Sequence, residues 1–155
     1  MSNEAKDLGA LRDRIDAIDG TVLKLLNERA QIALEVAEVK QASAGDVPPV
    51  FYRPEREAQV IRRMMDENPG PLSGEKVALV YRQIMSACLA LEEPLKVAYL
   101  GPEGTFTQLA TIKQFGAYVL GQPLVTVDDV FREVETESCH YGVVPVENST
   151  ERVVS

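Results

Sequence analysis

Residues 8–40 read LGALRDRIDAIDGTVLKLLNERAQIALEVAEVK, and their apolar residues recur at alternating spacings of three and four. That period predicts one long helix with a single apolar stripe. The stripe consists of Leu8, Leu11, Ile15, Ile18, Val22, Leu25, Ile32, Val36 and Val39. Arg29 takes the stripe position that follows Leu25, and Lys40 also projects inside the stripe. Because a buried cation without a counter-charge is strongly disfavoured, these two residues predict either acidic partners or an anionic ligand.

The length of this helix predicts a dimer. A helix of about 33 residues is roughly 50 Å long, whereas a compact domain of ~90 residues is about 26 Å across. Most of the stripe would therefore be uncovered in a single chain. Arg12 lies at the stripe edge about 25 Å from Arg29, too far to reach the same pocket, whereas Lys40 is only about 16 Å from Arg29. We predict an antiparallel, intertwined homodimer with composite sites, in which Arg12 serves the pocket of the partner chain.

Composition narrows the classes of partner. The chain has 155 residues, of which 45% are hydrophobic and 26% are charged, which is typical of a globular protein. Its net charge of -8 disfavours nucleic acid and anionic membranes, so an anion site must be a local cationic pocket for a small ligand. No leader or membrane-span pattern is present, and we expect a cytoplasmic protein. Cys88 and Cys139 lack metal-ligand spacing, so we expect reduced thiols and no metal site.

Two shorter helices follow the long one. A loop over 41–49 ends before Pro54, which suits the first turn of a helix that stops at 68–71. Ser73 is the expected N-cap of a third helix, whose apolar stripe includes Cys88 and reaches Glu92 four residues later. The sequence thus predicts an all-α unit over 1–94, with an ionisable group beside a buried face.

From residue 95 the pattern changes to alternating strands and helices. Strands are expected over 96–100, 124–127 and 142–146, with helices over 108–115 and 128–137. This alternation predicts a parallel sheet, with ligand groups beyond the carboxyl ends of its strands. Because so few elements bury little surface, we expect 95–155 to be an incomplete α/β lobe.

The polar residues of the three helices suggest binding rather than covalent chemistry. They include Arg12, Arg29, Lys40, Arg56, Glu57 and Glu92, and they contain no nucleophile–base pair. Such a set suits a reaction that reorganises bonds within a dianionic substrate, held in a compact conformer with donors aimed at the oxygen that gains charge. A sigmatropic rearrangement fits this description.

Four motifs carry a resemblance to a known family. LRDRIDAID, LLNERAQIALEVAEVK, FYRPERE and SACLALEEPLKVAYLGPEGTFT resemble the bifunctional P-protein family, in which an AroQ-class helical chorismate mutase is fused to prephenate dehydratase. The resemblance covers essentially the whole chain. It implies a homodimer that rearranges chorismate to prephenate without a cofactor, in the synthesis of phenylalanine.

The resemblance also implies roles for particular residues. Arg12 of the partner chain, Arg29 and Arg56 would bind the substrate carboxylates. Lys40 would contact a carboxylate and the ether oxygen of the breaking bond, and Glu57 would hold the substrate hydroxyl. Cys88 is included among the substrate-binding residues.

Two positions depart from the family pattern. Where familiar members have a glutamine that donates to the ether oxygen, this chain has Glu92, which must be protonated to donate. We therefore expect burial to raise the pKa of Glu92 and neighbouring cations to oppose that shift. Arg53 stands where some members carry an acid near the hydroxyl, and it is either a substrate-binding residue or a solvated arginine before a helix.

The last part of the chain resembles the first lobe of prephenate dehydratase through GPEGTFT and VPVENST. Thr105, Thr107 and Asn148 are its candidate site residues, the two threonines being possible donors near a helix N-terminus. The family's Thr-Arg-Phe motif and its phenylalanine-sensing ACT domain do not occur in these 155 residues, and Arg152 replaces a usual glycine. We expect that these residues alone do not dehydrate prephenate.

A different class of function stays open at this point. The chain could be a non-catalytic helical dimerisation module, in which Arg29 and Lys40 pair with Glu35, Glu38 or the partner chain. A regulatory amino-acid-binding domain has little support, because no recognisable sensing segment is present.

Overall fold

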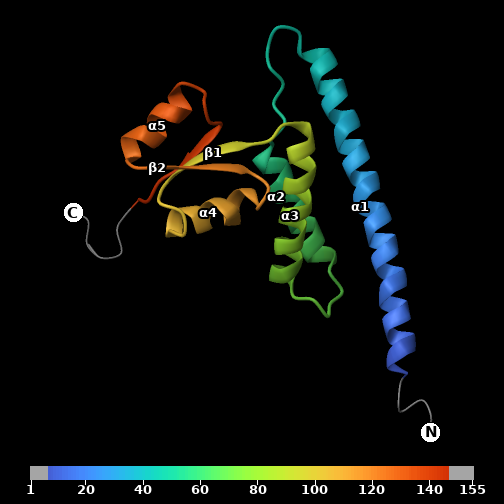
Figure 1. Ribbon diagram of the computed structural model, residues 1–155. Coiled ribbons are helices and arrows are strands. Elements are labelled where there is room, and N and C mark those ends of the chain that lie inside the picture. The colour runs from blue at the N-terminus through green and yellow to red at the C-terminus, as the bar shows by residue number, and fades with distance from the viewer. Residues whose placement is uncertain (1–6, 147–155) are drawn as a thin grey trace.

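The computed structural model describes residues 7–146, as three helices followed by a small α/β lobe (Figure 1). The helices are α1 (Leu8–Ala44), α2 (Pro54–Glu67) and α3 (Gly74–Glu92). The lobe contains β1 (Lys96–Leu100), α4 (Phe106–Phe115), β2 (Leu120–Leu124), α5 (Val127–Glu135) and β3 (Tyr141–Val143). This order confirms the predicted all-α unit with an α/β unit after it. No helix within residues 7–146 is long and apolar enough to cross a membrane.

The helices begin where the sequence predicts. Pro54 occupies the first turn of α2, and the Ser73 hydroxyl caps α3 by accepting a hydrogen bond from the backbone N–H of Lys76 at 3.2 Å. Helix α1 continues past the expected end at Lys40, because no helix breaker occurs before Gly45, whose φ is +64°.

The predicted apolar stripe of α1 is exposed in the single chain, as the length of this helix predicts. Eight of its members have exposed fractions between 41% and 68%: Leu8, Ile15, Ile18, Val22, Leu25, Ile32, Val36 and Val39. Helix α1 instead packs on α3 through its small residues Ala30, Ala33 and Ala37, which permit close approach of the two helices. The N-terminal part of α1 extends beyond α3 (Figure 1).

The lobe has a three-stranded sheet in the order β2-β1-β3, and both pairs are parallel as predicted. Helices α4 and α5 lie on opposite faces of this sheet (Figure 1). Val97 packs with Phe115 of α4, whereas Ala98, the next residue of β1, packs with Val130 of α5.

Two strand positions were predicted wrongly. Strand β2 covers 120–124 rather than 124–127, and β3 covers 141–143 rather than 142–146. Backbone hydrogen bonds fix β2: the Leu120 N–H donates to the Leu95 carbonyl, and the Gly101 N–H donates to the Leu124 carbonyl, both at 2.8 Å. Pro123 is tolerated in β2 because this is an edge strand, on which the backbone N–H groups that face away from β1 need no sheet partner.

One hydrophobic cluster joins α3 and the segment before α2 to the lobe. Its buried members come from the segment before α2, from α3, from the linker and from the lobe: Tyr52, Leu89, Leu95, Val97 and Phe115. The Tyr52 ring packs against Phe115 and Tyr141, with ring centroids 5.7 and 5.4 Å apart. The lobe is therefore packed onto the helical unit rather than tethered to it by a linker alone.

The same substitution at two glycines should have opposite effects on stability. Gly116 has φ +89°, and a Cβ there would lie 2.4 Å from the Ser86 Cβ, so Gly116→Ala should lower the free energy of unfolding by about 2 to 4 kcal/mol. Gly20 has open space around it in α1, and Gly20→Ala should raise stability by about 0.5 to 1 kcal/mol. Denaturant unfolding measures both, and equal changes in the two variants would contradict the close packing of the lobe on α3.

Candidate functional site

A cavity of about 180 Å³ lies between the three helices. It brings together seven of the side chains that the sequence predicts for the site: Arg29, Lys40, Arg53, Arg56, Glu57, Cys88 and Glu92. The remaining wall is formed by Ala33, Phe51, Val60, Met85 and Leu89. Each helix contributes both polar groups and apolar wall.

The cavity has an excess of positive charge. Three cationic side chains, those of Arg29, Lys40 and Arg56, face two carboxyls, those of Glu57 and Glu92, and a fourth, Arg53, is paired with Glu55. The surplus is therefore one positive charge when both acids are ionised and two when one of them is protonated. Cations crowded into a partly enclosed space repel one another and lose hydration. A small dianion of matching size would relieve both costs.

Lys40 is held by the segment that joins α1 to α2. Its Nζ donates to the Val50 carbonyl at 3.1 Å and lies 5.7 Å from the centroid of the Phe51 ring. Neither contact supplies a counter-charge, since one partner is a neutral acceptor and the other is an aromatic face. Lys40 can therefore still donate hydrogen bonds to an anion in the cavity.

The surroundings of Glu92 favour its neutral form, as the sequence predicts. Burial raises its pKa above the ordinary value of a glutamate, and the positive charges of Lys40 and then Arg29 oppose that shift. A carboxyl in this environment takes up a proton at a higher pH than an exposed one. In its protonated form Glu92 offers an O–H donor beside two cations.

Glu57 is also affected by burial. Desolvation raises its pKa, while Arg82 and then Arg29 lower it. The Arg82 Nη1 lies 3.5 Å from the Glu57 Oε1, and both side chains are largely shielded from solvent. Glu57 thus presents a hydrogen-bond acceptor at the cavity wall, backed by an arginine outside it.

Arg53 lies at the edge of the cavity, and Arg12 lies outside it in the single chain. Arg53 lines the cavity, but its side chain is 56% exposed and pairs with Glu55 at 2.8 Å, so it stands at the solvent edge. Arg12 does not line this cavity in the single chain and lies on the exposed part of α1. The structure therefore separates Arg12 from the other residues, as helix geometry requires.

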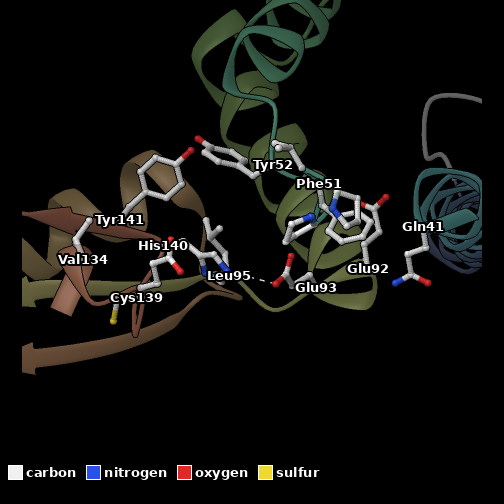
Figure 2. A pocket seen from close by; sticks show the side chains of 14 residues that line it. Gln41, Phe51, Tyr52, Glu92, Glu93, Leu95, Val134, Cys139, His140 and Tyr141 are labelled. Atoms are coloured by element: carbon white, nitrogen blue, oxygen red, sulfur yellow. Dashed lines mark hydrogen bonds and ion pairs between the residues drawn. The ribbon is translucent and has the colours of Figure 1, made fainter. Parts of the chain in front are cut away.

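A larger cleft of about 800 Å³ opens beside the cavity, between the segment before α2, the end of α3 and the lobe (Figure 2). Phe51 and Glu92 line both spaces and so form the wall between them. His140, which also lines this cleft, accepts the Lys96 N–H at Nδ1 at 2.9 Å, and its Nε2 lies 3.4 Å from Glu93. These contacts give His140 a structural role.

The dehydratase candidates lie at the far side of the lobe. The hydroxyls of Thr105 and Thr107 are 2.9 Å apart and both donate to the carbonyl of Leu100, at the carboxyl end of β1. Asn148 lies outside the described residues. Cys88 and Cys139 are buried free thiols.

Two residues at the site were missed from the sequence. Phe51 lies within the FYRPERE motif, so its position next to the site residues was a usable signal. Arg82 had no such signal, because its significance comes from a contact with Glu57 across two helices.

Comparisons with known proteins match both parts of the chain. The family model "Chorismate mutase type II" matches residues 11–93, and the model "Prephenate dehydratase" matches residues 97–155. The bifunctional chorismate mutase/prephenate dehydratase of Pseudomonas aeruginosa is 57% identical over 149 residues, which cover 96% of this chain and 41% of that protein. The protein of the same name from Aquifex aeolicus is 44% identical over 154 residues, which cover 97% of this chain and 41% of that protein.

A solved structure matches the helical part. It is the chorismate mutase (Form II) of Thermus thermophilus, with 31% identity and a TM-score of 0.51, over 56% of this chain and 93% of that one. The present chain spans about two fifths of the length of the curated relatives named above.

Proposed function

The chain belongs to the type II chorismate mutase family, and from this premise we propose that it converts chorismate to prephenate in the cavity between α1, α2 and α3. The observation that carries the proposal is the surplus of positive charge in that small cavity, which amounts to two when Glu92 is protonated. Chorismate is a compact dianion, so its charge matches the surplus. The reaction breaks one C–O bond and forms one C–C bond within the substrate, and no group is gained or lost.

The residues of the cavity divide into carboxylate binders and donors to the reacting oxygen. Arg29 and Arg56 would bind the two carboxylates, and Glu57 would accept a hydrogen bond from the substrate hydroxyl. These contacts hold the substrate in the folded conformer that the rearrangement needs, which removes the entropic cost of reaching it. Cys88 would close the wall on α3.

Lys40 and Glu92 would act on the ether oxygen, which gains negative charge as the C–O bond breaks. They line the cavity from α1 and from the end of α3. Lys40 supplies a positive charge and a donor, and protonated Glu92 supplies a second donor. Donors fixed in advance stabilise developing charge more than water does, because they need not reorganise.

A second copy of the chain would complete the site. The exposed apolar stripe of α1 is an extended surface that an isolated chain leaves in water, and an apolar cavity of about 400 Å³ lies beside it between α1 and α3. An antiparallel partner helix would cover this surface and bring its own Arg12 to the cavity, about 25 Å from where this chain's Arg12 lies. The proposed protein is a cytoplasmic homodimer with two shared sites.

The lobe matches the first part of a prephenate dehydratase. The chain would then be one part of a multifunctional enzyme. Thr105 and Thr107 would contribute hydroxyls at the carboxyl end of β1. The rearrangement in the helical unit would supply the substrate of the second reaction.

The alternative is a non-catalytic dimerisation module. It would require Arg29 and Lys40 to be neutralised by protein carboxylates such as Glu35 and Glu38. Within residues 7–146, neither of these glutamates forms an ion pair with either cation. The observed contacts of Lys40 with the Val50 carbonyl and the Phe51 ring favour the catalytic proposal.

Removing Lys40 should abolish turnover without unfolding the protein. Lys40→Ala deletes one donor to the developing charge, which should cost about 3 to 4 kcal/mol, or a 10²- to 10³-fold loss of kcat. Chorismate consumption measures the rate, and circular dichroism verifies the fold. Lys113→Ala, at an exposed lysine of α4, is the matched control and should keep normal turnover. A Lys40→Ala protein with near-normal turnover would remove this assignment.

Activity should fall as pH rises, because Glu92 donates only while protonated. Burial raises the pKa of Glu92, so the donor form persists above the ordinary range of a glutamate and is lost as pH increases through the raised pKa. Glu92→Gln keeps a donor at every pH and should flatten this decline. Glu93→Gln, at a carboxylate that contacts His140, should leave the profile unchanged. A decline that persists in Glu92→Gln would exclude the role.

Paired variants test whether Arg12 acts on the partner's site. A heterodimer of an Arg12→Ala chain and a Lys40→Ala chain has one site free of both substitutions, so it should regain about half of wild-type activity.

The control places both substitutions in one chain and pairs it with a wild-type chain. Both sites are then damaged, and activity should be lost. Separate affinity tags on the two chains allow purification of each heterodimer. The opposite pattern, with activity only in the control, would show that Arg12 serves its own chain.

A further inference from the structure

Arg82 of α3 connects the proposed active site to the α/β lobe. Its Nη1 lies 3.5 Å from the Glu57 Oε1 and donates to the Gln114 carbonyl, in the last turn of α4, at 2.9 Å. The side chain of Arg82 is 24% exposed and that of Glu57 is 15% exposed, so this link is mostly shielded from solvent. One guanidinium nitrogen thus contacts both a cavity residue and the lobe.

The lobe is fixed to α3 at this point by further contacts. The Gln83 side chain accepts the Ala117 N–H at 2.8 Å, and the Ser86 hydroxyl accepts the Tyr118 N–H at 3.3 Å. Gly116 lies so close to Ser86 that a Cβ would overlap with it. The turn that follows α4 is therefore held rigidly on α3, and it presents the Gln114 carbonyl to Arg82 at a defined place.

The charges around Glu57 indicate how the contact with Arg82 affects this carboxylate. Arg82 faces Glu57 from α3, Arg29 faces it from α1, and Tyr52 faces it from the segment before α2. Burial alone would favour the neutral acid, which has less capacity to accept a hydrogen bond. Arg82 counters this with a positive charge placed outside the cavity, where it does not compete for the substrate carboxylates.

We propose that Arg82 is a positioning residue for the chorismate mutase site: it holds the Glu57 carboxylate at the cavity wall and fixes it relative to the last turn of α4. Arg82 does not line the cavity, so it would not touch a substrate bound there. Arg82 would act through Glu57. Because Arg82 also contacts the Gln114 carbonyl of α4, the lobe would help to support the helical site. This inference rests on the proposed function of the cavity.

Arg82→Gln tests the proposal, because a glutamine amide can still donate to the Gln114 carbonyl but carries no charge. We expect the KM for chorismate to rise about tenfold, with a smaller change in kcat, since an acceptor for the substrate hydroxyl is lost from its place. Loss of the nearby positive charge should also raise the pKa of Glu57, so the acid limb of the pH–rate profile should move to higher pH. Arg82→Lys should restore both values in part.

Two controls separate this role from a purely structural one. Arg132→Gln removes an exposed arginine of α5 that pairs with Asp129, and it should change neither KM nor the acid limb. A structural role for Arg82 would lower the melting temperature and the active fraction while leaving KM and the acid limb at wild-type values, and that result would overturn the proposal.

A measurement that needs no turnover distinguishes failure of this inference from failure of the proposed function. The ¹³C shift of the Glu57 carboxyl, assigned with Glu57→Gln, can be titrated in the wild-type chain and in Arg82→Gln. A higher Glu57 pKa in Arg82→Gln supports the positioning role even if the wild-type chain converts no chorismate. An unchanged Glu57 pKa overturns that role even if the chain is an active mutase.

Discussion

Helix α1 places its cations where two packing surfaces meet, and the rest of the structure depends on that placement. One surface carries Ala33 and Ala37 and packs on α3, while the other carries Ile32 and Val36 and is uncovered in the single chain. Arg29 and Lys40 lie between these surfaces at the cavity. The cations are thereby drawn away from bulk water, and among residues 7–146 neither forms an ion pair with a carboxylate. That arrangement is costly unless an anion completes it.

The two acids of the cavity, Glu57 and Glu92, differ in their cationic partners. Both Glu57 and Glu92 have pKa values raised by burial and lowered by neighbouring cations. Glu57 has a partner in Arg82 at 3.5 Å, whereas Glu92 faces Lys40 and Arg29, which are also the proposed contacts of the substrate. Once those cations are engaged by a dianion, Glu92 loses much of the pressure to ionise, which suits a group proposed to donate a proton in a hydrogen bond.

The α/β lobe supports the cavity from outside. Tyr52 is buried against Phe115 and Tyr141, and the residues before it, Val50 and Phe51, hold the ammonium group of Lys40. A rigid second layer of this kind limits the freedom of the groups that meet the substrate, which is how binding geometry is kept within a fraction of an ångström. The helical unit and the lobe are thus mechanically connected, although their proposed chemistries are separate.

The sequence by itself determined the elements and most of the proposed site, because both follow from local rules. Helical period, the Pro54 start, the Ser73 cap and the alternation of strands and helices act over a few residues, and the family motifs carry the site residues with them. Strand β2 was misplaced because its position depends on bonds to Leu95 and Gly101, which outweigh the strand propensity of 124–127. Only the tertiary structure decided which face of α1 meets α3 and that Arg82 lies behind Glu57, since these depend on side chains distant in sequence, whose contact no local pattern encodes.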